Sequence, residues 1–180
     1  RGADTFALKG FWQDKGRVSK SENDCRDLVL DRLRERLAPL GVLVSRERTA
    51  AQDKRSDQCA EFIRDGRRIA LPIEVKRADH DKLWTAWRDQ LQRYYVNDPD
   101  ADGHGLYLVL WFGQKVAIHP EGLKPQGAAH LQTLIERRIP AQDRSRLAVL
   151  VLDLSWPEAT SGAAPALARG SGRPARSPVG

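Results

Sequence analysis

Three charged side chains stand at spacings that suit a metal ion and a phosphate. Asp57 begins an alternating apolar stretch, and Glu74 and Lys76 end the next one. Between the two stretches lies Asp65-Gly66, a dipeptide typical of a two-residue β-hairpin turn. With these two residues as the loop, the register places Asp57 opposite Glu74, and directly opposed residues share a face of the sheet. Lys76 falls on the same face because side chains alternate along a strand.

The other face of this predicted hairpin is apolar, so the register is strongly specified. It carries Ala60, Phe62, Ile69, Leu71, Ile73 and Val75. Pro72 complicates the second strand, because proline cannot donate a ladder hydrogen bond and so predicts an edge position or a bulge. A bulge there would move Glu74 by one position.

Two opposed carboxylates destabilise a sheet unless a cation lies between them. Oxygen ligands with open positions suit Mg²⁺. Such an ion activates water and stabilises charge on a phosphate oxygen, and the ammonium of Lys76 adds a further positive charge. These are the parts that phosphodiester hydrolysis requires. Glu-x-Lys by itself is far more typical of a solvated strand face, so the hypothesis depends on the register.

A polar residue interrupts the apolar stripe of the helix predicted to follow. Leu83, Trp87, Gln90 and Tyr94 share one helical face, and an amide among apolar residues needs hydrogen-bond partners. Gln90 either reaches a water or phosphate at the site or binds a strand carbonyl. Tyr94 is expected in the core.

Further candidates surround this centre. Glu22, in the first turn of the first predicted helix, is either a third carboxylate at the metal or a partner of the helix dipole. We expect His80, Arg55 and Arg77, with Tyr94, as contacts to nucleic acid. Ordinary surface positions are the alternative for the first three, and a core position is the alternative for Tyr94.

Helices and strands alternate along the chain. Helices are predicted over residues 22–38, with Ser21 as N-cap, 81–96 and 126–138, and strands over 41–46, 57–64, 67–76, 105–112 and 147–154. Residues 1–20 are interpreted as an N-terminal extension or the end of a preceding domain, 21–154 as the nuclease-like domain, and 155–180 as a disordered tail or linker. Because the sequence begins with Arg1 and contains no Met, we expect a piece of a larger polypeptide.

Composition constrains the partners only weakly. The net charge is +6, but residues 21–154 carry 22 basic and 21 acidic groups, so bulk charge says little about nucleic acid. The longest apolar run, 106–112, has the length of a strand, so no membrane partner is expected. Cys25 and Cys59 are too few for a disulfide framework, which favours a reducing, cytoplasmic compartment.

The pattern resembles the PD-(D/E)XK nuclease superfamily. Asp57 and the run Ile73-Glu74-Val75-Lys76 match its motif, although Ser56 stands where the family name has Pro. Gln90 to Tyr94 is similar to the Q-x-x-x-Y signature of the RecB-like branch. The resemblance covers roughly residues 21–112, with the strand at 147–154 as a further sheet member.

This resemblance implies an α/β fold with a restriction-endonuclease-like core (α-β-β-β-α-β), a central mixed sheet flanked by helices. It also implies Mg²⁺ or Mn²⁺ bound by Asp57, Glu74 and the carbonyl of Val75. Lys76 would then position or activate water, Gln90 would assist, and Glu22 would complete the metal shell.

The function expected from this pattern is a metal-dependent nuclease domain acting on nucleic acid, with DNA as the first choice. We expect it inside a larger protein such as an anti-phage defence effector. Two alternatives stay open: an inactive binding module of the same fold, and a toxin tip that cleaves transfer RNA. The sequence also leaves open whether the chain forms a homo-oligomer.

Overall fold

Alternating apolar segments along the chain form a central five-stranded sheet in the computed structural model, which describes residues 8–14, 18–49, 55–96 and 98–156. The elements are β1 (Trp12–Gln13), β2 (Val18–Ser19), α2 (Glu22–Leu37), η2 (Ala38–Leu40), β3 (Leu43–Thr49), β4 (Arg55–Arg64), β5 (Arg67–Arg77), η4 (Trp87–Tyr95), β6 (Gly105–Trp111), α3 (Ala128–Arg138), η5 (Ala141–Asp143) and β7 (Leu147–Asp153).

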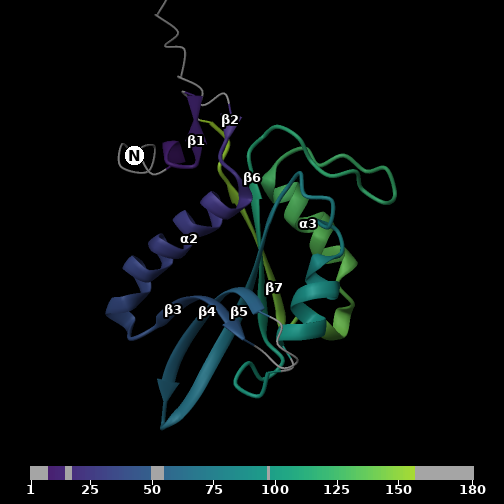
Figure 1. Ribbon diagram of the computed structural model, residues 1–180. Helices are drawn as coiled ribbons and strands as arrows, with labels where there is room; N and C mark the ends of the chain where they lie inside the picture. Colours follow the sequence, from purple (N-terminus) through teal and green to yellow (C-terminus); the bar gives the residue numbers. More distant parts are fainter. Residues whose placement is uncertain (1–7, 15–17, 50–54, 97, 157–180) are drawn as a thin grey trace, which may run out of the picture.

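The sheet has the order β3-β4-β5-β6-β7. β3, β4 and β5 pair antiparallel, whereas β5, β6 and β7 pair parallel. Figure 1 shows α2 on one side of the sheet and α3 on the other. The predicted mixed α/β sheet with flanking helices is therefore confirmed. Among the described residues, no helix has the length and apolarity needed to cross a membrane.

The hairpin between β4 and β5 has the predicted register. Asp65 and Gly66 both have positive φ, 53° and 73°, as a two-residue type I′ turn requires. The pairs run from Arg64 with Arg67 to Gln58 with Ile73. The next position along the same register is Asp57 with Glu74; the backbone of Asp57 lies in β4, but its side chain is outside the described residues.

Pro72 lies in β5 without a bulge. It pairs with Cys59 in the unbroken register. In a two-residue hairpin the pair that closes the turn is hydrogen-bonded, and hydrogen-bonded and non-hydrogen-bonded pairs then alternate along the ladder. The pair of Pro72 with Cys59 is a non-hydrogen-bonded one, so the nitrogen of Pro72 points away from β4. The pairing of β5 with β6 begins only at Ile73, so Pro72 faces a locally open edge. Of the two predicted alternatives the edge position is found, and Glu74 keeps its predicted place.

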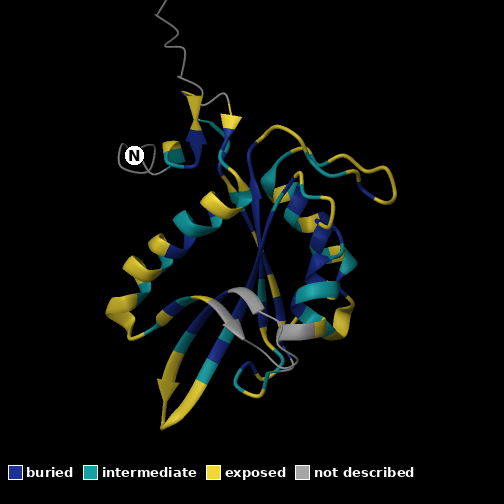
Figure 2. Ribbon diagram, viewed as in Figure 1, coloured by how far each residue is buried: buried dark blue, intermediate teal, exposed yellow. Residues whose placement is uncertain are grey.

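Both faces of the second half of β5 are buried because helices cover both sides of the sheet. On the α2 side, Ile73 and Val75 pack with Cys25, Val29 and Leu30 of α2. The core on the other side contains residues from β6, η4 and α3, namely Tyr107, Val109, Leu91, Leu131 and Ile135. Figure 2 shows this burial at the centre of the sheet and exposed residues at the tip of the β4–β5 hairpin. Phe62, predicted on the apolar face, is accordingly 37% exposed.

The first helix begins where its capping residue predicts. The hydroxyl of Ser21 accepts a hydrogen bond from the backbone nitrogen of Asp24 at 3.2 Å. This satisfies one of the backbone donors left free in the first helical turn. The cap fixes the direction in which Glu22, the next residue, leaves the loop.

The helix expected over 81–96 is shorter and wound differently. η4 is a π-helix over Trp87–Tyr95, and the hydrogen bond from the nitrogen of Val96 to the carbonyl of Leu91 spans five residues. A Cβ on Gly105 would lie 2.9 Å from side-chain atoms of Leu91 and Val96, so β6 and this helix pack very closely. The wider winding places Trp87 and Leu91 in the core, where α-helical spacing had placed Trp87 and Gln90.

The described part of the N-terminal segment packs on the same core as α2. Trp12 is 6% exposed, and its indole nitrogen donates to the carbonyl of Leu154 at 2.8 Å. Its ring meets Phe112 and Trp156 edge to face, with centroids 5.3 Å and 5.9 Å apart. Residues 8–14 and 18–20 thus contribute to the core that the sequence assigned to 21–154. Most of the predicted tail, 157–180, lies outside the described residues.

Candidate active site

The centre of the site is the second half of β5. Glu74 and Lys76 are 2% and 5% exposed and lie on one face of the strand. Val75, between them, points into the core on the α2 side. Tyr107 of β6 is the parallel partner of Glu74, so a second strand contributes to the site.

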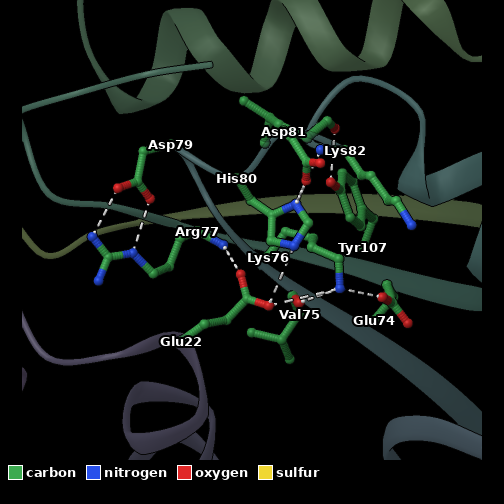
Figure 3. Close-up of polar contacts among 11 residues, drawn as sticks. Glu22, Glu74, Val75, Lys76, Arg77, Asp79, His80, Asp81, Lys82 and Tyr107 are labelled. Atoms are coloured by element: carbon green, nitrogen blue, oxygen red, sulfur yellow. Dashed lines mark hydrogen bonds and ion pairs between the residues drawn. The ribbon is translucent and has the colours of Figure 1, made fainter.

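Three oxygen atoms of this centre lie around the ammonium of Lys76 (Figure 3). Nζ donates to Oε1 of Glu74 at 2.5 Å and to the carbonyl of Val75 at 3.1 Å. Oε1 of Glu22 lies 3.8 Å from the same nitrogen. Two carboxylates and one backbone carbonyl thus surround a single positive charge, which explains how these acidic groups are tolerated in a buried place.

Glu22 reaches β5 from the first turn of α2. Its Oε2 accepts a hydrogen bond from the backbone nitrogen of Arg77 at 2.9 Å. Its Oε1 faces Lys76 and lies 4.0 Å from Nε2 of His80. The structure therefore brings Glu22 and His80 to the centre formed by Glu74 and Lys76.

His80 presents one ring nitrogen to this centre. Its Nδ1 accepts a hydrogen bond from the backbone nitrogen of Lys82 at 3.0 Å. The same Nδ1 lies 2.8 Å from Oδ1 of Asp81. Nε2 is the ring atom nearest Glu22, and because His80 is half-buried, this atom lies at the rim of the site.

Arg77, predicted to contact nucleic acid, is bound within the protein. Its guanidinium forms a two-pronged ion pair with Asp79 at 2.9 Å and 3.0 Å. It also donates to the hydroxyl of Ser19 at 2.9 Å and to the carbonyl of Lys20, and it lies over the ring of Phe112. These contacts give Arg77 a structural role that joins the end of β5 to β2.

The other predicted site residues are placed only in part. Gln90 is half-buried, and its side-chain oxygen is buried without a hydrogen-bond partner. Such an atom is an acceptor that a water or ligand can use. The side chains of Asp57, Arg55 and Tyr94 lie outside the described residues.

Tyr107 is a member of the site that sequence reasoning missed. Its hydroxyl donates to the carbonyl of Leu83 at 2.7 Å. Burial first, and then the nearby charges of Glu74 and Glu22, raise its pKa well above the usual value for a tyrosine. It therefore stays neutral and holds the start of the segment that leads into η4. The only signal in the sequence is one hydroxyl within the apolar run of residues 105–112.

These donors fit a hard divalent ion. Glu74, Glu22 and the Val75 carbonyl offer oxygen atoms, the ligand type that Mg²⁺ and Mn²⁺ take, and they already converge on one cation, the ammonium of Lys76. Among the side chains that the structure describes, no group of three acidic, histidine or cysteine residues forms a ready metal site. An ion at this place would need the carbonyl, or Asp57, as a further ligand.

Comparison with known proteins places the chain in a family. Residues 4–114 match the family described as Domain of unknown function (DUF8371), which is more than half of the chain. The chain belongs to this family. The DUF8371 region contains Glu22, Glu74, Lys76 and His80 and ends just after β6, so α3 and β7 lie beyond it. No curated protein and no solved structure matches the chain.

Proposed function

We propose that this chain is a metal-dependent nuclease domain that hydrolyses phosphodiester bonds, with DNA as the first substrate to test. One observation carries the proposal: Glu74 and the Val75 carbonyl of β5, together with Glu22 of α2, surround the buried ammonium of Lys76. Charged groups that are buried together and are not needed for packing are typical of functional sites. The resemblance of the Asp57, Glu74 and Lys76 pattern to PD-(D/E)XK nucleases gives the reaction class.

A divalent ion held by Glu74, the Val75 carbonyl and Asp57, with Glu22 as a further candidate, would neutralise the negative charge that develops on the phosphate. The chain's own groups have separate tasks. Lys76 provides a positive charge that can hold an attacking water or a phosphate oxygen. Glu22 orients Lys76 and fixes the end of β5 through the backbone of Arg77. Gln90 offers its unpartnered oxygen to a water.

A binding module without catalysis is the second candidate, and one observation favours it. Glu74 is 2% exposed, so a phosphate can reach it only if the surrounding residues move. A toxin tip that cleaves transfer RNA would use the same centre and differs from a DNA nuclease only in substrate. All three functions can be separated in one assay.

The deciding experiment incubates the full chain with duplex DNA, single-stranded DNA and RNA, each with Mg²⁺, with Mn²⁺ and with EDTA. Glu74→Ala and Lys76→Ala are tested beside two controls, Glu35→Ala and Lys124→Ala, which remove the same charges from exposed positions. We expect metal-dependent cleavage that both site variants lose and both controls keep. Cleavage of RNA alone would favour the toxin reading, and binding without cleavage in any condition would favour the binding module.

The cellular setting is a separate part of the proposal. Cys25 and Cys59 are buried thiols that form no disulfide, which suits the reducing cytoplasm. Membership of a longer polypeptide with a role in anti-phage defence stays a prediction.

A further inference from the structure

A cavity with positively charged walls lies on the side of the sheet covered by η4 and α3. Its volume is about 550 Å³, within the range of about 300–1,000 Å³ typical of small-ligand pockets. Its described lining comes from the segment before and within η4, the loop after β6 and the end of α3, and includes Trp84, Trp87, Arg88, His119, Arg137 and Arg138.

The charge in this cavity is unbalanced. Three arginines line it against one carboxylate, that of Glu121. The charge of Arg88 is balanced by Asp89, whose Oδ1 lies 2.8 Å from the Nε of Arg88. Glu121 approaches Arg138 only at 3.4 Å, and its own side chain is 71% exposed. Exposed ion pairs of this kind contribute little, so the charges of Arg137 and Arg138 are largely available to a ligand.

Arg138 lines the cavity as a partly exposed cation. Its side chain is 27% exposed, whereas its Nε is buried, so the Nη atoms are the donors that a ligand in the cavity can reach. The guanidinium group presents its donors as a fork that matches the oxygens of a phosphate. Arg137 and Arg138 stand in the last turn of α3, where the helix backbone itself repels anions. An anion must therefore be held by the arginine side chains.

The walls of the cavity are held in place before any ligand arrives. The indole of Trp84 donates to the carbonyl of Ala117 at 3.1 Å, and that of Trp87 donates to the carbonyl of Trp84 at 3.2 Å. His119 packs edge to face on Trp84, with ring centroids 4.4 Å apart. The two indole donors are therefore already used, and the charged donors of the cavity belong to its arginines.

We propose that this cavity binds a phosphate group, with Arg138 as the principal contact and Arg137 as the second. The phosphate is either a diester within a nucleic-acid chain or the terminal monoester of a nucleotide. Because binding here needs no metal and no reaction, the proposal stands apart from the nuclease activity and is measured without it.

The test measures binding of a fluorescent single-stranded oligonucleotide to the full chain by anisotropy, in EDTA, over a series of salt concentrations. Arg137→Gln/Arg138→Gln removes both charges from the cavity. Arg32→Gln/Arg36→Gln, on the exposed face of α2, removes the same charge elsewhere and serves as the matched control. Thermal melting of each variant verifies the fold, and the single variant Arg137→Gln is measured if the double variant melts early.

We expect the cavity variant to bind about tenfold more weakly. Its plot of log affinity against log salt should be shallower by about 1.4, because each lost phosphate contact on a single strand removes about 0.7. The control should match the wild type. A 5′-phosphorylated oligonucleotide with an uncharged backbone, compared with an unphosphorylated normal one, identifies which phosphate is bound. Equal losses in both double variants, or equally strong competition by a polyglutamate peptide, would overturn the proposal.

Discussion

The ammonium of Lys76 lies 2.5 Å from a carboxylate oxygen of Glu74, two positions earlier on the same strand, and both side chains are buried. A buried pair of this kind contributes little net stability, but removing one partner leaves the other charge buried without compensation. The pair therefore makes a quantitative prediction about folding as well as about catalysis.

In metal-free buffer, we expect Glu74→Gln and Lys76→Met each to lower the free energy of unfolding by about 3–5 kcal/mol. The double variant should be less destabilised than the sum of the two, because neither Glu74 nor Lys76 is then left charged without the other. Urea denaturation of the four proteins measures this coupling. Simple additivity would show that the two groups do not depend on each other.

Lys76 also occupies the place where the oxygen atoms of the site converge, so it competes with any metal ion that uses them. We expect Lys76→Met to bind Mn²⁺ about tenfold more tightly than the wild type while losing cleavage. Isothermal titration calorimetry measures the affinity, and Lys124→Met controls for the loss of one positive charge. Unchanged or weaker binding in Lys76→Met would show that the ammonium does not compete with the metal.

Glu22 separates the effect of charge from that of structure. Glu22→Gln keeps an oxygen acceptor for the backbone nitrogen of Arg77 but removes the charge beside Lys76. We expect cleavage to fall about 10–100-fold, as for groups that orient a metal site, with little change in the melting temperature. Glu35→Gln, on the exposed side of the same helix, should leave both unchanged. A large loss of stability in Glu22→Gln would assign this residue to folding alone.

The N-terminal segment should be needed for folding because Trp12 is part of the core. Trp12→Ala removes a buried indole and its hydrogen bond to Leu154, so we expect a loss of about 3–5 kcal/mol in the free energy of unfolding. Val18→Ala, in the neighbouring strand but 47% exposed, should change it by less than about 0.5 kcal/mol. A loss in the free energy of unfolding as small for Trp12→Ala as for Val18→Ala would show that this segment does not unfold together with the rest of the domain.

Cys25 gives the stability a pH dependence. Burial, the dominant cause, raises the pKa of its thiol to about 11. Between pH 9 and 10 the unfolded chain loses this proton while the folded chain keeps it, so stability must fall as the pH rises. For this group alone we expect a fall of about 1 kcal/mol over that interval. Urea denaturation of Cys25→Ala should show a correspondingly flatter profile, and an unchanged slope would contradict the assignment.

The hairpin could be predicted because its determinants are local. The turn residues Asp65 and Gly66 fix the register, and the alternation on both strands reports which face is apolar. Ser21 fixed the start of the first helix in the same way. These short-range rules gave the positions of Glu74 and Lys76 on one face of β5.

Other features depend on contacts between distant parts of the chain and were not predictable. The π-helix of η4 packs against a strand with glycine at position 105, and nothing in the spacing of its apolar residues distinguishes it from an α-helix. Trp12 donates a hydrogen bond to Leu154, which lies 142 positions later in the sequence, directly after β7. The sequence predicted Arg77 as a surface cation. Its hydrogen-bond acceptors, the carbonyl of Lys20 and the hydroxyl of Ser19, lie more than 50 positions earlier in the chain.

The hydrogen bonds of Arg77 connect β5 to the segment that precedes α2. Its backbone is held by Glu22 and its guanidinium by Ser19 and Lys20, and Lys76 is the residue immediately before it. A rotation of the short segment that leads into α2 would therefore change, through Arg77, the position of the Lys76 ammonium. A partner that binds this segment would then alter the proposed site without entering it.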